Sequence, residues 1–215
     1  MLSTWAAFRL PAEPLAMCID DVAPAAMAGG ADSVRLVSLA VTYPATLQHS
    51  AVRMNSAILR MEDGNGLGIA PSQLLDRIGI RVNGGAIQYS QIMTVMGSEF
   101  VLQLADTGLV LSGSDSLSID IVGDFRLEAP YSSFAVTILS LGSFDAHDMS
   151  DPEHNVGVFG LAGCTNLFPF ATGTTSILLP AGRPVAVRTV RPVQVAPAGN
   201  QNVVMFEGTL SYNSP

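Results

Sequence analysis

The sequence predicts an all-β protein, an antiparallel β-sandwich with extended segments at both ends of the chain. Three observations indicate this fold. Apolar and polar residues alternate with period two along most of the chain, short turns rich in Gly, Asn, Asp and Ser separate the alternating runs, and helical periodicity is nearly absent. Consecutive short strands without helices between them favour an antiparallel sandwich or barrel over an α/β fold.

The alternating runs define the expected strands in order. They cover residues 33–43, 51–61, 77–82, 86–92, 99–105, 115–127 and 132–141, and a last strand is expected at 202–212. The stretch "VNGG" after the third run predicts a tight hairpin, because Asn-Gly tolerates the positive φ angles of such a turn. The one stretch with helical spacing is "APSQLLDRIG", residues 70–79, which predicts a single short turn that starts near Pro71.

The composition excludes several kinds of function. Hydrophobic residues make up 48% and charged residues 13%, the net charge is −8, and all ten basic residues are arginine. Without lysine there is no P-loop or Schiff-base lysine, and no basic patch is present to follow a nucleic-acid backbone, so nucleic acid is not expected as a partner. No run reaches the roughly 18–20 apolar residues of a transmembrane helix. The excess hydrophobicity is expected in a sheet core and in surfaces that meet other copies or domains.

Two cysteines, Cys18 and Cys164, leave two alternatives open. They form a disulfide, as an extracellular protein can hold, or they are two buried free thiols. The opening residues "MLSTWAAF" lack the basic region and the apolar core of a secretory signal. The chain is therefore expected to be a mature protein without its leader or a segment of a longer one.

A phrase near the start of the chain returns near its end. Leu10-Pro11-Ala12 matches Leu179-Pro180-Ala181, Val22–Ala25 matches Val195–Ala198, and the two segments close on Tyr43-Pro44 and Ser214-Pro215, in an alignment that needs gaps. The repeat predicts the tail of one unit, a complete unit and the beginning of the next. The expected divisions are an N-terminal extended segment or donor strand at 1–30, the main sandwich at 31–148, and residues 149–215, which complete the sandwich or begin a second unit.

Several stretches resemble a known kind of module. The run from "SVRLVSLAVTYP" through "APSQLLDRIGIRVNGG", the run "DSLSIDIVGDFRLEAPYSSFAVTILSL" and the linker-like "LLPAGRPVAV" together resemble the tandem Ig-like β-sandwich modules of very large secreted bacterial proteins. The similarity covers most of residues 22–215, in pattern and turn placement. The resemblance implies an Ig-like or jelly-roll-like sandwich that acts as a spacer, stalk or adhesive surface and carries no catalytic residues.

One acidic stretch is a candidate metal site. Closely spaced carboxylates can supply the oxygen ligands of Ca²⁺, and paired histidines favour a transition metal. The spacing fits neither an EF-hand nor an H-E-x-x-H helix, and a solvated acidic loop is the alternative. The candidate calcium-type ligands are Asp145, His147, Asp148, Asp151 and Glu153, with His154 beside them. Apart from Ca²⁺ at this loop, no cofactor is expected.

Apolar and aromatic residues at the two repeat junctions are candidates for contacts between units. Aromatic side chains bury large areas and dominate interface energetics. Exposed on one sheet face, the junction aromatics, which include Phe168 and Phe170, would instead form a platform for carbohydrate. The candidate interface residues are Trp5, Phe8, Leu10, Val203, Met205, Phe206 and Leu210.

These observations predict a structural function rather than catalysis. No G-x-S-x-G elbow is present, and only His49, His147 and His154 could serve as a histidine base. We therefore expect a non-enzymatic extracellular or cell-surface protein, a subunit or repeat unit of a filament, stalk or layer, assembled with copies of itself or with tandem units by strand complementation. The alternatives are a carbohydrate- or calcium-dependent binding module of a secreted adhesin, and a β-sandwich viral coat protein.

Overall fold

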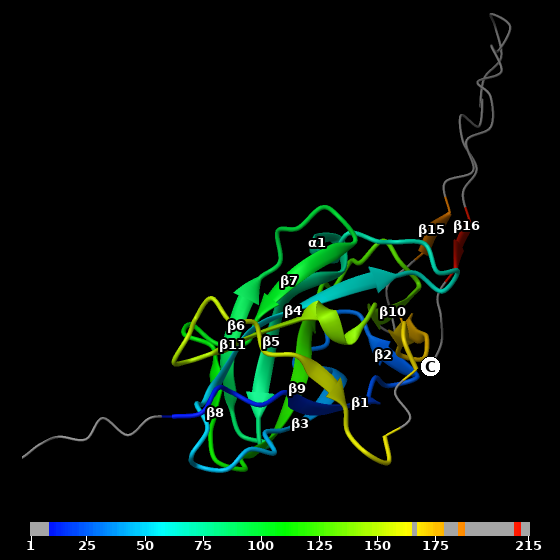
Figure 1. Ribbon diagram of the computed structural model, residues 1–215. Coiled ribbons are helices and arrows are strands. Elements are labelled where there is room, and N and C mark those ends of the chain that lie inside the picture. The colour runs from blue at the N-terminus through cyan, green and yellow to red at the C-terminus, as the bar shows by residue number, and fades with distance from the viewer. Residues whose placement is uncertain (1–8, 165–166, 179–184, 188–208, 212–215) are drawn as a thin grey trace, which may run out of the picture. The chain divides into compact units, whose positions relative to one another are not determined.

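The chain divides into two units, and the elements described in them are mostly β-strands. The computed structural model describes residues 9–164 and 167–178, with the backbone strands 185–187 and 209–211 (Figure 1). Unit 1 covers Met1–Leu178 and unit 2 covers Leu179–Pro215. Unit 1 consists of two β-sheets around one apolar core, which confirms the predicted all-β sandwich. Unit 2 contains the antiparallel pair of β15 (Val185–Val187) and β16 (Thr209–Ser211).

The first sheet of unit 1 has six strands. Its spatial order is β12 (Val158–Gly160), β1 (Leu15–Asp21), β3 (Val34–Thr42), β9 (Ser116–Phe125), β5 (Leu75–Val82) and β6 (Ile87–Ile92). At its centre, the carboxylate of Asp120 on β9 accepts hydrogen bonds from Arg35 and from Ser38 on β3, each at 2.8 Å. Asp120 is buried, and its charge is paired with that of Arg35. A buried charge needs such a partner and such hydrogen bonds to be tolerated.

The second sheet of unit 1 has eight strands gathered around the long strand β4 (Val52–Glu62). The main path runs β11 (Phe144–Asp148), β4, β10 (Ser133–Ile138), β14 (Thr175–Leu178) and β2 (Ala26–Ala28). Beside this path, β7 (Glu99–Gln103) and β8 (Leu109–Leu111) pair with β4, and β13 (Phe170–Ala171) pairs with β10. A short 3-10 helix, η1 (Leu141–Ser143), separates β10 from β11.

The core lies between the two sheets and follows from the alternation of side chains. Along β3, Leu36, Leu39 and Val41 are fully buried, and along β4 the same holds for Met54 and Leu59. Because successive side chains of a strand point to opposite faces, strands such as β4, β7 and β11 offer one apolar face to the core and one mixed face to the outside. β9 and β10 instead carry runs of consecutive buried residues. The ring of Phe134 on β10 contacts that of Phe125 on β9, with centroids 4.9 Å apart, and so joins the two sheets.

The structure differs from the predicted antiparallel pattern and from the expected divisions of the chain. β1 pairs with β12 in parallel, and β2 pairs with β14 in parallel, because both partners arrive from distant parts of the chain. Residues 15–28, expected in an extended segment outside the sandwich, supply β1 and β2, and Leu15 and Met17 are fully buried. Residues 149–178 add β12, β13 and β14 to unit 1, which agrees with one of the two alternatives expected for residues 149–215.

The local predictions are confirmed at most positions. The seven expected strands between residues 33 and 141 are present as β3, β4, β5, β6, β7, β9 and β10, within three residues at each end. The expected short helical turn is α1 (Pro71–Leu74), which begins with proline as predicted. In the β5–β6 hairpin, Asn83 and Gly84 have φ angles of 51° and 68°, and Gly85 N–H donates to the Val82 carbonyl. In the described part of the chain, no helix is long and apolar enough to cross a membrane.

At one side of the sandwich, a side-chain amide links the two sheets. The edge strands β6 and β7 belong to different sheets, and the amide of Gln91 on β6 bridges them. Its Nε2 donates to the Val101 carbonyl at 3.0 Å, and its Oε1 accepts from the Gln103 N–H at 3.2 Å. The side-chain amide therefore takes the place that a backbone peptide of a neighbouring strand would have.

We expect Gln91→Ala to loosen this seam. The change removes two hydrogen bonds to β7, which corresponds to a loss of about 1–2 kcal/mol in the free energy of unfolding. Urea denaturation measures this loss, and faster amide exchange at Gln103 locates it. The control is Gln88→Ala on the same strand, where the side chain is exposed and the expected change is within about 0.5 kcal/mol. Equal effects of the two substitutions would contradict the bridging role of Gln91.

Candidate assembly surfaces

The segment that leads into the sandwich is fixed against the β3–β4 connection. Leu10 N–H donates to the Gln48 carbonyl at 3.0 Å, and Ser50 N–H donates to the Leu10 carbonyl at 2.8 Å. Nδ1 of His49 donates to the Pro11 carbonyl at 2.9 Å. Two prolines, Pro11 and Pro14, lie in this segment and favour its extended course. The chain therefore enters unit 1 at a fixed position.

A buried carboxylate completes this attachment. Asp148, at the end of β11, is 2% exposed, and its Oδ2 accepts the Ala12 N–H at 2.8 Å. Its Oδ1 accepts both the N–H and the hydroxyl of Ser150 at 2.7 Å. Burial raises the pKa of Asp148, but hydrogen bonds from the Ser50 hydroxyl, Ala12 and Ser150 outweigh it and hold that pKa well below the usual range. The group is therefore a carboxylate that ties residue 12 to the second sheet.

A buried tyrosine lies beside this carboxylate. Tyr43 follows β3 and is fully buried, and its hydroxyl donates to the Ser50 carbonyl. The same oxygen accepts the Glu13 N–H at 3.2 Å. Burial raises the pKa of Tyr43, and the nearby charge of Asp148 raises it further, so the hydroxyl stays protonated and remains a donor. Tyr43, Ser50, Asp148 and Ser150 together form what we call the N-terminal anchor.

The strand that leaves unit 1 is held just as firmly. β14 pairs with β10 and with β2, the Thr175 hydroxyl donates to the Pro24 carbonyl at 2.7 Å, and Gly29 N–H donates to the Leu178 carbonyl at 3.0 Å. Just before β14, Gly173 N–H donates to the carboxylate of Asp21 at 2.7 Å. The last described residue of unit 1 is therefore fixed next to the connection between β2 and β3.

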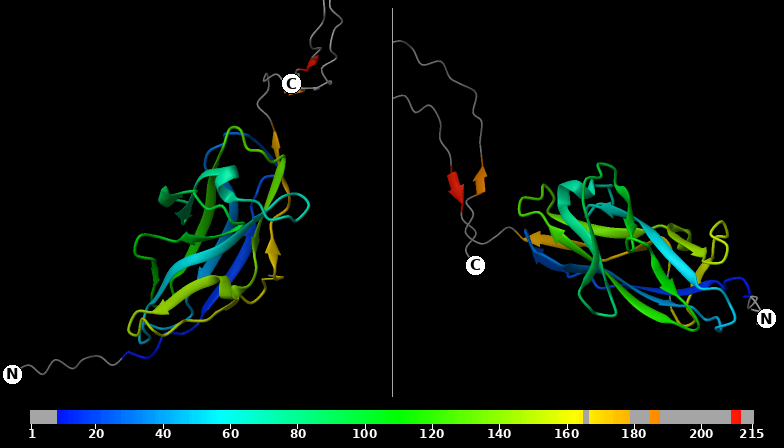
Figure 2. Two further views of the ribbon diagram at one scale, coloured as in Figure 1. Left: turned by 90° about the horizontal axis from the view of Figure 1, so that it is seen from above. Right: turned by 90° about the vertical axis from the view of Figure 1, so that its left-hand side faces the viewer.

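The two attachments lie at opposite ends of the sandwich. Leu10 lies beside residues 48–50, which follow the end of β3, whereas Leu178 lies beside Gly29, which precedes its start. β3 has nine residues, which span about 30 Å at 3.3 Å per residue. Figure 2 shows the blue start of the described chain at one end of unit 1 and the orange strand β14 at the other. The chain therefore passes through unit 1 from end to end.

The two cysteines are joined. Cys18 on β1 and Cys164, which follows β12, form a disulfide with their Cα atoms 5.8 Å apart and a sequence separation of 146. This decides between the two alternatives that the sequence leaves open. Each cysteine is close in sequence to one of the two attachments. Cys18 comes eight residues after Leu10, and Cys164 comes shortly before β14.

The predicted metal ligands are not brought together. Asp145 binds His147 through Oδ1 at 2.7 Å and Asn55 through Oδ2 at 3.0 Å, while Asp148 belongs to the N-terminal anchor. Asp151 and Glu153 are exposed beyond the end of β11. Among the described residues, no three His, Cys, Asp or Glu side chains form a group that could hold a metal ion. The acidic stretch, expected as a loop, is in part the strand β11, whose alternate residues Phe144 and Ala146 are buried.

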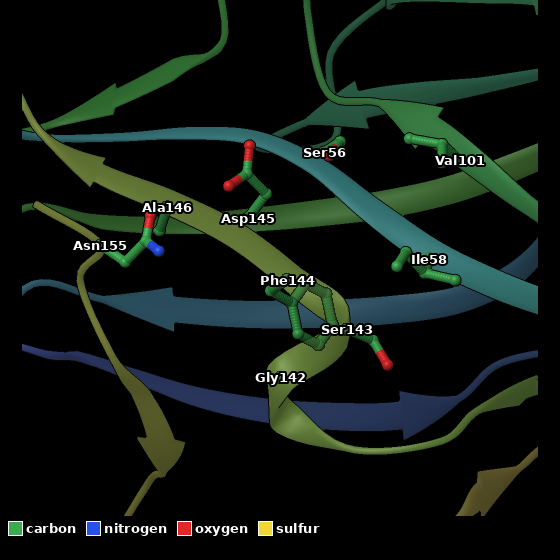
Figure 3. Close-up of a pocket in the computed structure, with 9 residues that line it drawn as sticks. All are labelled: Ser56, Ile58, Val101, Gly142, Ser143, Phe144, Asp145, Ala146 and Asn155. Atoms are coloured by element: carbon green, nitrogen blue, oxygen red, sulfur yellow. The ribbon is translucent and has the colours of Figure 1, made fainter. Parts of the chain in front are cut away.

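A shallow pocket lies over the outer face of the second sheet. Its volume is about 360 Å³, and it is lined by Ser56, Ile58, Val101, Gly142, Ser143, Phe144, Asp145, Ala146 and Asn155 (Figure 3). Ile58 and Val101 face each other on β4 and β7 and are each more than two-fifths exposed. Phe144, the aromatic residue of this lining, is nearly buried. The pocket therefore offers apolar surface and a few polar groups but no exposed ring for a sugar to stack on.

The predicted interface residues lie mostly outside the described residues. This holds for Trp5, Phe8, Val203, Met205 and Phe206, and Leu210 is described only as part of the backbone of β16. Leu10 is two-fifths exposed and belongs to the entering segment. Phe168 and Phe170 are half-buried and pack against the core of unit 1. The sequence reasoning missed the anchor residues Tyr43 and Ser50, although Tyr43 belongs to the phrase that returns at the end of the chain.

Comparisons with known proteins leave the family open. No protein-family model and no curated protein matches the sequence. Among solved structures, the chain is similar to AvmM, described as catalysing macrocyclization in alchivemycin A biosynthesis, with 11% identity, a TM-score of 0.38, and coverage of 78% of this chain and 90% of that one. It is also similar to the CssB subunit of colonization factor CS6 of enterotoxigenic Escherichia coli, complemented with a donor strand from CssA, with 16% identity, a TM-score of 0.30, and coverage of 76% and 97%. Both TM-scores lie below 0.5, so neither likeness assigns this chain a function.

Proposed function

We propose that this chain is a non-enzymatic structural protein, a repeat unit or subunit of a surface stalk, filament or layer. In such an assembly the sandwiches follow one another in series, and segments beyond each sandwich add strands to neighbouring units. The observation that carries this proposal is the passage of the chain through unit 1 from one end to the other. Attachments at opposite ends give head-to-tail growth, which produces open filaments when the rotation between units does not close.

The disulfide supports a location outside the cell. Disulfides persist in oxidising surroundings such as the cell exterior and the periplasm, and they are rare in the cytosol. Cys18 and Cys164 join two segments of unit 1 that are distant in sequence, as expected for a structural bond. We therefore propose that the protein works at the cell surface or outside the cell.

The binding-module alternative is less well supported by the described residues. A sugar-binding platform needs exposed aromatic rings along one sheet face. In the part of the chain with described side chains, Phe159 on β12 is the exposed aromatic residue, and the pocket of the second sheet has none. A single exposed ring on an edge strand does not form such a platform.

Assembly through the segments beyond the sandwich can be tested by truncation. We expect the full chain to form elongated head-to-tail species whose mass grows with concentration, in sedimentation velocity and in negative-stain electron microscopy. Removal of residues 1–8, or of residues 179–215, is expected to leave single sandwiches at every concentration. Both truncations keep the core of unit 1, whereas a longer deletion through residue 20 would remove buried Leu15, Met17 and Ile19.

Urea denaturation provides the control for these truncations. Each shortened chain should unfold with the midpoint of unit 1 in the full chain, which shows that loss of assembly is not loss of folding. A full chain that stays a compact monomer over the whole concentration range, as both truncations do, would rule out strand exchange between separate chains.

A further inference from the structure

The antiparallel pair β15–β16 of unit 2 repeats the register of the antiparallel pair β1–β3 of unit 1, whose connection contains β2. For brevity we call both pairs hairpins. In unit 1, β1 and β3 pair antiparallel with these residues opposite one another: Ala16 and Thr42, Met17 and Val41, Cys18 and Ala40. In unit 2, β15 and β16 pair antiparallel with these: Val185 and Ser211, Ala186 and Leu210, Val187 and Thr209. Each residue number of the second hairpin exceeds its counterpart by 169, as for Ala16 and Val185.

This constant spacing removes the gaps from the repeat seen in the sequence. Both strands keep the same offset, so the connections between them have equal length in the two hairpins. The spacing retains the match of Leu10-Pro11-Ala12 with Leu179-Pro180-Ala181 and replaces the match of Pro44 with Pro215 by that of Tyr43 with Tyr212. It also leaves the match of Val22–Ala25 with Val195–Ala198 out of register.

Two positions where unit 1 needs a particular residue are kept at this spacing. Gly30 has a φ of +78°, and a Cβ there would lie 3.1 Å from Cδ1 of Leu127, so glycine is strongly favoured. Tyr43 is the buried tyrosine of the N-terminal anchor. Glycine and tyrosine stand again at positions 199 and 212 of the sequence. The register and these two identities are independent observations, and both give the same period.

An isolated two-stranded ribbon is marginal in water, and three strands or more are needed for independent stability. In unit 1 the second edge of β3 is covered by β9 along eight residue pairs. In the described part of unit 2, β16 pairs with β15 alone. We therefore expect the other edge of β16, which corresponds to the edge of β3 that β9 covers, to need a strand equivalent to β9 for stability.

We propose that residues 179–215 are the opening hairpin of a second sandwich with a period of 169 residues, and that the partner of β16 is a β9-type strand of a further copy of the module. This inference rests on the proposed function and names the contact that joins the units. Leu210 takes the position of Val41, which is fully buried, and Ser211 takes that of the half-buried Thr42. The partner strand completes the first sheet of the second sandwich as β9 completes that of unit 1.

The test extends the full chain by the part of the module that the hairpin lacks. At a spacing of 169, Pro215 corresponds to Thr46, so the extension continues directly from Pro215 with a second copy of residues 47–178. We expect a second cooperative unfolding transition, and amide exchange at Thr209, Leu210 and Ser211 that is slowed about 100-fold relative to the full chain. Protection that appears in the unextended chain with rising concentration would instead show that a separate molecule supplies the strand.

Two matched substitutions test the register in the extended chain. Leu210→Asp is expected to abolish the second transition, because it places a charge at the position of buried Val41. Ser211→Asp is expected to retain it, because Thr42 lies on the other face of the strand. A positive control replaces residues 179–215 of the extended chain by residues 10–46, which are known to fit the module.

The result that overturns the inference is specific. It is a single transition in the extended chain while the positive control shows two, or equal behaviour of the two aspartate variants. This outcome is distinct from failure of the proposed function, which is measured as assembly of the unextended chain. A second unfolding transition in the extended chain, together with no assembly of the unextended chain, would separate the two proposals. It would support the second sandwich and contradict strand exchange between molecules.

Discussion

Replacement of both Cys18 and Cys164 by alanine is expected to lower the free energy of unfolding of unit 1 by about 5 kcal/mol. The disulfide joins residues 146 positions apart, and the chain-entropy relation gives about that value for a loop of this length. The bond removes conformations from the unfolded chain, because it prevents β1 from separating from the segment after β12. Urea denaturation of the oxidised protein and the double variant measures the difference.

The reduced wild-type protein is the control for this prediction. Reduction with a thiol should lower stability by nearly the same amount as the double substitution, since both remove the same constraint. Peptide mapping without reduction should recover the two cysteines in one linked fragment. A double variant within about 1 kcal/mol of the oxidised protein would contradict a constraint of this size.

We expect Asp148→Ala to have the second largest effect, a loss of about 3–4 kcal/mol in the free energy of unfolding. The substitution leaves the Ala12 N–H and the Ser150 hydroxyl without their buried acceptor. It also removes one of two acceptors from the Ser150 N–H, which keeps Ser50 Oγ, and from the Ser50 hydroxyl, which keeps the Ala51 carbonyl. Chemical denaturation measures the loss at neutral pH. Faster amide exchange at Ala12 would show that the entering segment has come away from the second sheet. The matched control is Asp151→Ala, at an exposed position, where the change should stay within about 0.5 kcal/mol.

The same carboxylate makes stability depend on pH. Hydrogen bonds lower the pKa of Asp148 in the folded protein below the value of about 3.9 found in unfolded chains. The stabilisation is therefore present above about pH 4 and is lost as the pH falls toward the folded pKa. Asp148→Asn should flatten this part of the stability profile. An acid profile with the same slope in wild type and variant would show that another group controls it.

Much of unit 1 could be predicted from the sequence because its central strands have local signals. β3, β4 and β9 alternate strongly over nine or more residues, and the hairpin after β5 contains the Asn-Gly pair that its positive φ angles require. β1 was not among the predicted strands, because prolines flank it. Its first three residues are all buried, so it lacks the alternation that indicates a strand. β11 was expected as an acidic loop, because three of its five residues are Asp or His. Only two apolar residues, Phe144 and Ala146, indicate an inward face.

The N-terminal anchor could not be predicted, because it depends on contacts between distant segments. The sequence indicates Asp148 as one of several acidic residues that could bind Ca²⁺. In the structure it is a carboxylate, but it accepts hydrogen bonds from Ala12 and Ser150 instead. Its acceptor role needs Ser50 and Ala12, which lie about a hundred residues or more away in the chain. The parallel pairs of β1 with β12 and of β2 with β14 have the same origin, since no local pattern indicates which distant strand covers a sheet edge.

In the proposed serial assembly, the position of the disulfide would have a mechanical consequence. Tension applied through Leu10 and Leu178 would pass along β1 to Cys18, cross the covalent bond to Cys164 and leave through β14. The chain between the two cysteines, with a sequence separation of 146 and a fully extended length of about 500 Å, would carry none of that tension while the bond is intact. Each module could lengthen only by the short segments outside the bridge. A fibre of such modules would therefore extend little under tension. Reduction of the one disulfide in each module would let the module unfold and the fibre lengthen.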